Sequence, residues 1–76
     1  MQLNLGQVKK LLEFGGSTGI KQTVLNTALT RLRRTYEEDP CQETLEKCTG
    51  EINGILGRFS SILGDDFNLI SKIIGN

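Results

Sequence analysis

Apolar residues return at alternating steps of four and three along the second half of this chain, and this spacing constrains the fold more than any other feature. The series is Cys41, Leu45, Cys48, Ile52, Ile55, Phe59 and Ile62. Residues at this spacing share one side of an α-helix, so the series predicts a long helix with a single apolar seam. The stretch "EEDPCQ" predicts its start, with Asp39 as N-cap, Pro40 as the first helical residue and Gln42 reaching back as in a capping box.

The rest of the chain follows the same helical period. We expect a first helix over residues 5–14 that stops at "GGSTG", and a second that starts near Ser17 or Gly19 under a hydroxyl cap. The inward face of this second helix is expected to consist of Leu25, Ala28, Leu29, Leu32 and Tyr36. The stretch "GDD" is expected to end the long helix and to cap a last short helix over residues 67–74.

Length and connections predict how these helices pack. The chain has 76 residues, which suits one small all-α domain over residues 1–76. Helices joined by short connections become antiparallel neighbours. We therefore expect a small antiparallel bundle of four helices, centred on the hairpin of the second and third helices.

The charges are distributed unevenly although the net charge is zero. Residues 1–36 carry a balance of +5 and residues 37–76 a balance of −5. Two interpretations follow. Either the two halves fold against each other and partly neutralise, or the basic half faces nucleic acid or an acidic partner.

Three glycines interrupt the predicted long helix and, with Ser61, form a strip roughly opposite its apolar seam. Each glycine costs about 0.5–1 kcal/mol relative to alanine in a helix interior. Small side chains allow another backbone to approach closely, so we interpret the strip as a face for a protein partner or a second copy. The alternative is a solvated surface that tolerates the glycines. We expect the partner to contact this strip and the last helix, at Gly50, Gly54, Gly57, Ser61, Phe67 and Ile70.

The residue types argue against an enzyme. The chain has no histidine, which excludes histidine-based catalytic dyads and the commonest zinc ligand. "GGSTGIK" lacks the residue order of a phosphate loop, and "EEDP" lacks the alternating ligands of a calcium loop. We therefore expect no catalytic residues, no metal, no cofactor and no small-molecule substrate.

The cysteines and the hydropathy pattern bear on location. If Cys41 and Cys48 lie on one helix, their Cα atoms are about 10.5 Å apart, too far for an intrachain disulfide. Two unpaired thiols favour a reducing compartment, so we expect a cytoplasmic protein; the alternative is a disulfide between two chains. No apolar run approaches the roughly 20 residues that cross a bilayer, so we expect no transmembrane segment.

Residues 18–34, "TGIKQTVLNTALTRLRR", resemble the turn and recognition helix of helix-turn-helix proteins. Gly19 stands in the place of the turn glycine, and Leu25 and Leu29 in the places of inward residues. The resemblance implies a DNA-binding regulator that contacts DNA through Lys21, Gln22, Asn26 and Arg33.

A second resemblance covers more of the chain. The order of "LNTALTRLRR", a polar turn, "ETLEKCTGEINGILGRFSSIL" and a short last helix is similar to that of small four-helix bacteriocin immunity proteins. Membership would imply a cytosolic bundle that engages a membrane receptor–bacteriocin complex, with residues 63–76 setting specificity. The residues themselves favour a broader interpretation: a non-enzymatic regulator, inhibitor or adaptor that binds another protein, with a homodimer as one form of self-association.

Overall fold

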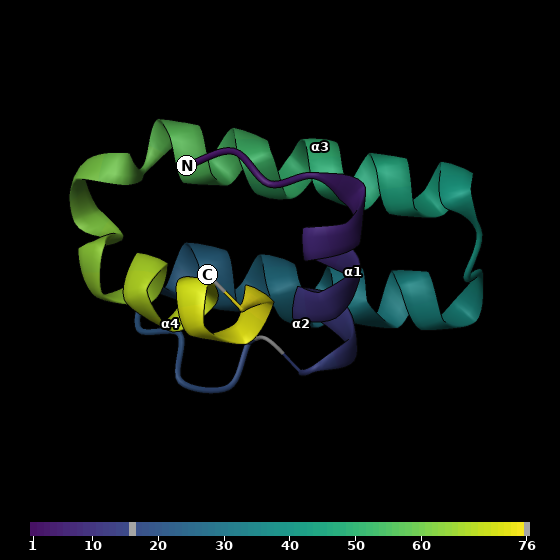
Figure 1. Ribbon diagram of the computed structural model, residues 1–76, viewed down its shortest axis with the longest axis horizontal. Coiled ribbons are helices and arrows are strands. Elements are labelled where there is room, and N and C mark those ends of the chain that lie inside the picture. Colours follow the sequence, from purple (N-terminus) through teal and green to yellow (C-terminus); the bar gives the residue numbers. More distant parts are fainter. Residues whose placement is uncertain (16, 76) are drawn as a thin grey trace.

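An antiparallel hairpin of two long helices forms the centre of the molecule (Figure 1). The computed structural model describes residues 1–15 and 17–75. These residues form four α-helices, one 3-10 turn and no strand, so the predicted all-α fold of four helices centred on the second and third is confirmed. In chain order the elements are α1 (Leu5–Glu13), α2 (Thr23–Glu38), α3 (Gln42–Arg58), η1 (Ser60–Ile62) and α4 (Gly64–Ile74).

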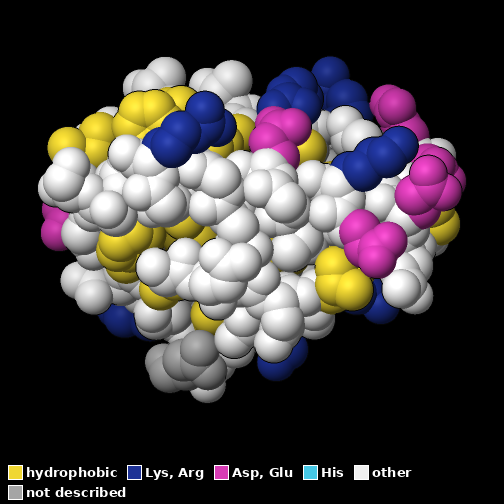
Figure 2. Space-filling view, turned by 90° about the horizontal axis from the view of Figure 1, so that it is seen from above, with side chains coloured by type: hydrophobic (Ala, Val, Ile, Leu, Met, Phe, Trp, Pro, Cys, Tyr) yellow, Lys and Arg dark blue, Asp and Glu magenta, His cyan; other side chains and the backbone are white. Residues whose placement is uncertain are grey.

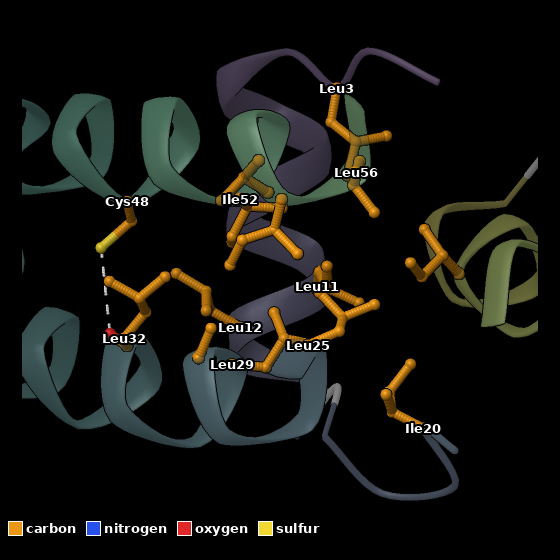
Figure 3. Packing of buried hydrophobic residues seen from close by; sticks show 14 of the residues in the cluster. Leu3, Leu11, Leu12, Ile20, Leu25, Leu29, Leu32, Cys48, Ile52 and Leu56 are labelled. Atoms are coloured by element: carbon orange, nitrogen blue, oxygen red, sulfur yellow. Dashed lines mark hydrogen bonds between the residues drawn. The ribbon is translucent and has the colours of Figure 1, made fainter. Parts of the chain in front are cut away.

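Helix α1 covers one face of the α2/α3 hairpin. Figure 1 shows α1 running across the hairpin rather than along it, and α1 packs against both α2 and α3. Helix α4 in turn packs against α1. Leu11 and Leu12 of α1 meet Leu25 and Leu29 of α2 and Ile52 of α3 in the apolar core drawn in Figure 3. The core is aliphatic and lies on this covered side of the hairpin.

Asparagine side chains fix the N-terminal segment. Asn4 caps α1 by accepting from the Gln7 N–H, and the Gln7 side chain accepts from the Asn4 N–H, which completes a capping box. The side-chain amide of Asn53, in α3, forms two hydrogen bonds with the backbone of Leu3. It accepts from the Leu3 N–H and donates to the Leu3 carbonyl, each at 2.8 Å. The Leu3 side chain is thereby packed into the core.

The predicted start of α2 is wrong by several residues. No hydroxyl of Ser17 or Thr18 caps the helix, which begins at Thr23 after the N-cap Gln22. Asp66 of α4 takes the capping role from a distance. Its carboxylate is 2 % exposed and accepts the N–H groups of Lys21 at 2.7 Å and Gln22 at 3.1 Å.

The predicted ends of α3 are also wrong. The helix begins at Gln42 with Cys41 as N-cap, so Pro40 lies before the helix and the proposed capping box is absent. Asp39 accepts instead from the Thr44 hydroxyl at 3.1 Å. At the other end α3 stops at Arg58, ahead of "GDD", and α4 starts at Gly64 rather than at residue 67.

The two predicted apolar faces are confirmed over their central turns. In α2 the residues Leu25, Ala28, Leu29 and Leu32 are buried, and in α3 the residues Leu45, Cys48, Ile52 and Ile55 are buried. Both ends of the α3 seam depart from the prediction: Cys41 is exposed and Ile62 is 51 % exposed. The reason is that neither residue lies within the helix.

Candidate partner-binding site

A groove of about 550 Å³ runs between α2 and α3 on the side of the hairpin that α1 does not cover. Ala28 and Ile55 form its floor, while Val24 and Phe59 line one end and remain partly exposed. Both floor residues are almost fully buried, Ala28 at 5 % and Ile55 at 6 % exposed. The lining as a whole consists of Thr23, Val24, Thr27, Ala28, Arg31, Glu51, Ile55, Arg58 and Phe59.

Two arginines give the groove its charge pattern. Arg31 of α2 forms an ion pair with Glu51 of α3, so this pair joins the two helices at one part of the rim. Arg58, in the last turn of α3, donates from Nε to the Gly54 carbonyl at 3.3 Å. No carboxylate of the described residues forms an ion pair with Arg58. The groove therefore has one neutralised cation and one cation held only by its own helix backbone.

The predicted glycine strip lies on the outer side of α3, next to this groove. Gly50 and Gly57 are exposed, and a methyl group at either position would meet nothing within 4 Å. Gly54 is half-buried because the Arg58 guanidinium lies 3.7 Å from where its Cβ would be. No other segment of residues 1–15 and 17–75 lies over Gly50 or Gly57, so the strip is open.

Figure 2 looks down on α3. The middle of this face is mostly white, which marks uncharged polar side chains and backbone. Hydrophobic side chains gather toward one end beside a cationic side chain, and charged side chains of both signs gather toward the other. The face is thus largely uncharged at its centre, with an apolar area at one end.

The remaining predicted partner residues do not form one surface with the strip. Ser61 is exposed but belongs to η1, beyond the end of α3. Phe67 is half-buried against the core, and Ile70 is 0 % exposed. Placing Ile70 on a binding surface is therefore wrong for the folded chain, because its side chain is part of the core.

The residues implied by the helix-turn-helix resemblance have roles within the fold. Lys21 forms an exposed ion pair with Asp65 at 3.1 Å, and Gln22 is the N-cap of α2. The Asn26 amide donates to the Ser17 carbonyl at 2.7 Å and to the Ile20 carbonyl at 3.2 Å, which ties the preceding loop to α2.

Arg33 completes this set. It lies 4.0 Å from Glu37 and packs over Gly15. Because α1 ends at Glu13 and α2 begins at Thr23, the two helices are also farther apart in sequence than the three- or four-residue turn of that motif.

Two ion pairs between segments distant in sequence join the basic and acidic halves of the chain. Arg31 pairs with Glu51 and Lys21 with Asp65, each joining a residue before position 37 to one after it. The other two ion pairs of the described residues are local, at i and i+4. These contacts agree with the interpretation in which the halves fold against each other.

The cysteines occupy different environments. Cys41 is exposed, which corrects the expectation that it points into the seam, and Cys48 is buried. The Cys48 thiol lies 3.9 Å from the Leu32 carbonyl, the contact dashed in Figure 3. Burial raises the pKa of this thiol, although Arg31 and a backbone hydrogen bond act in the opposite direction. Among the described residues no three His, Cys, Asp or Glu side chains converge as metal ligands would.

Sequence reasoning missed the α2 side of the groove. It assigned Ile55 and Phe59 only to the seam, counted Arg31 only as a charge of the basic half, and assigned no role to Val24. A signal was present: Val24, Ala28 and Arg31 follow each other at steps of four and three, beside the Leu25–Leu32 face. What the sequence does not specify is which side of the hairpin α1 covers.

Together the fold and the groove define a small all-α protein with an open, apolar-floored surface on one side of a helical hairpin. No family model, curated protein or solved structure matches the chain. The resemblance to bacteriocin immunity proteins therefore stays a prediction from the sequence. Among the described residues no helix combines the length and the apolar character needed to cross a membrane.

Proposed function

We propose that this chain is a non-enzymatic protein that binds another protein through the open side of the α2/α3 hairpin. The observation that carries the proposal is the groove of about 550 Å³ with its floor of Ala28 and Ile55. A groove between two helices is a common receptor for a partner helix. The glycine strip extends the surface around α3; it is open at Gly50 and Gly57 and is bordered by the Arg58 side chain at Gly54. We expect a regulator, inhibitor or adaptor that works in the cytoplasm.

A photo-cross-linking amino acid at Thr27, on the rim of the groove, tests this proposal in the cells that make the chain. We expect discrete adducts with a partner protein from Thr27 and from Gly57. The matched control is Lys9, which is exposed on α1 and lies outside the groove. Adducts of the same kind and yield from Lys9, or none from Thr27 and Gly57, would contradict the proposal.

Self-association through the glycine strip is part of the same proposal. Sedimentation equilibrium under reducing conditions, at low and high salt, measures it directly. A salt-tolerant dimer that is lost in Gly54→Leu supports a homodimer on this strip. A monomer at all concentrations leaves the open side to a different protein.

The DNA-binding hypothesis stays a prediction with its own test. Binding to a nonspecific DNA duplex that weakens with salt, and weakens further in Lys21→Ala and Arg33→Ala, would favour it. The intramolecular contacts of Lys21, Asn26 and Arg33 favour protein binding instead, because a DNA contact would have to replace them.

A further inference from the structure

We infer that the α2/α3 groove receives about two turns of an amphipathic helix from another protein, and that an acidic residue on this helix pairs with Arg58. The inference rests on the proposed function and specifies the partner's chemistry. Three features of the described residues carry it: the length and floor of the groove, the unequal pairing of its two arginines, and the distribution of exposed apolar side chains over the chain.

The length and the floor of the groove fit a short helical segment. The α2 side extends from Thr23 to Arg31, about 12 Å at the helical rise of 1.5 Å per residue. This length accommodates about two turns of a second helix. Side chains at i, i+4 and i+7 of that helix would lie over Val24, Ala28 and Ile55, where the groove is apolar.

The arginines determine the sign of the partner's charge. Arg31 is already paired with Glu51, so its charge is neutralised within the fold. Arg58 lines the groove with only a backbone carbonyl as its hydrogen-bond acceptor in the described chain. A carboxylate is the group that complements an exposed guanidinium best, because it accepts two N–H groups at once. An acidic residue beside the apolar face of the incoming helix would supply a carboxylate that accepts hydrogen bonds from the Arg58 guanidinium.

A second copy of the chain fits the groove less well than a foreign helix. The large hydrophobic side chains that are most exposed are Met1, Phe14, Val24 and Ile62, at 46, 73, 39 and 51 %. Three of them lie outside the α-helices, at the N-terminus, at the end of α1 and in η1, and Val24 belongs to the groove itself. No α-helix of the described residues carries more than one of these four side chains, and the half-buried Leu69 and Ile73 of α4 pack against its own core, so none offers a stripe of strongly exposed apolar groups to another copy.

Two stapled helical peptides test the inference by fluorescence anisotropy against the full chain. Both carry leucines at i, i+4 and i+7, and they differ only in a glutamate or a lysine at i+3. At low salt we expect the glutamate peptide to bind roughly fivefold more tightly than the lysine peptide. High salt should reduce this ratio because the pair is at the exposed rim of the groove.

Substitutions in the chain identify the residue that causes the preference for the glutamate peptide. Arg58→Glu should reverse the preference so that the lysine peptide binds more tightly, and Arg58→Ala should abolish it. Arg34→Glu is the matched control, because Arg34 is an exposed arginine of α2 outside the groove lining and the preference should persist. Val24→Asp should weaken the binding of both peptides. Circular dichroism establishes that each variant is folded.

Several outcomes would overturn the inference. Equal binding of the two peptides, or a preference that survives Arg58→Glu, would remove the role of Arg58. A dimer of the chain that excludes the peptides would make a second copy the occupant. Binding of neither peptide, while Thr27 still gives a cross-linked adduct in cells, would reject the acidic helix and leave the proposed function intact. If neither peptide binds and Thr27 gives no adduct, both the inference and the proposed function are rejected.

Discussion

The two sides of the α2/α3 hairpin differ in what covers them. On one side α1 crosses both helices and brings Leu11 and Leu12 into contact with the hairpin core. On the other side Val24 and Phe59 stay partly exposed around a groove. A chain of 76 residues can form few further helices once the hairpin is made, so few remain to cover its two sides. The difference indicates that stability depends on the covered side, whereas the open side is free to change without unfolding the chain.

Truncation of a core residue should produce the largest effect and tests this division directly. Ile52 is 0 % exposed, so Ile52→Ala should lower the free energy of unfolding by about 2–5 kcal/mol. Val24→Ala, in the open groove, should cost less than about 1 kcal/mol because little buried area is lost. Urea denaturation followed by circular dichroism measures both. Equal losses would show that the open side is as important to the fold as the covered side.

Neighbouring aspartates offer the next comparison. Asp66→Asn replaces a buried carboxylate that accepts two backbone N–H groups, and its amide nitrogen would face one of those donors. We expect a loss of about 2 kcal/mol in the free energy of unfolding. Asp65→Asn removes only an exposed ion pair with Lys21 and should cost at most about 0.5–1 kcal/mol. Similar losses in the two variants would argue against the capping role of Asp66.

Asp66 also explains why the sequence predicts the helices better than their ends. The central apolar faces follow from periodicity alone, because residues such as Leu29 and Ile52 recur at helical spacing. The start of α2 depends on a carboxylate that lies more than 40 residues farther along the chain. Local capping rules then point to Ser17 and Thr18, since they consider only neighbouring residues.

The groove was beyond sequence reasoning for a related reason. Ile55 and Phe59 belong to the same spacing as the fully buried Ile52, so the pattern does not reveal that Phe59 stays partly exposed or that the buried Ile55 lies beneath a groove. The difference arises because α1 crosses only one side of the hairpin. The glycines, in contrast, were correctly predicted to lie opposite the seam, since the helical period alone fixes that angle.

The exposed glycines should respond in the opposite direction from the core residues. Gly50→Ala and Gly57→Ala should each raise the free energy of unfolding by about 0.5–1 kcal/mol, because space is free at both positions and alanine favours the helix. Gly15→Ala is the contrasting variant on the covered side. Its φ of +78° and the Arg33 guanidinium 3.2 Å from the new methyl group predict destabilisation. Thermal melts of the three variants distinguish a tolerant open side from a constrained covered side.

The titration of Cys48 should give the smallest effect, a pH dependence of stability that is absent near neutral pH and begins only at alkaline pH. Burial raises the pKa of its thiol in the folded chain, so folding favours the protonated form. Its contribution to stability is fully present below the unfolded pKa of about 8.5 and is lost as the pH rises through the higher folded pKa. Wild type should therefore lose more stability between neutral and alkaline pH than Cys48→Ala does.

Cys41→Ala is the matched control for this titration, because Cys41 is exposed. It should keep the alkaline loss of the wild type, and urea denaturation across the pH range measures the difference. Taking each variant relative to wild type removes every pH effect that the variants share. An alkaline loss that is unchanged in Cys48→Ala would contradict the prediction, because burial would then not raise the pKa of this thiol and water would reach it between α2 and α3. The contrast between a dry hairpin core and a hydrated open side would then no longer hold.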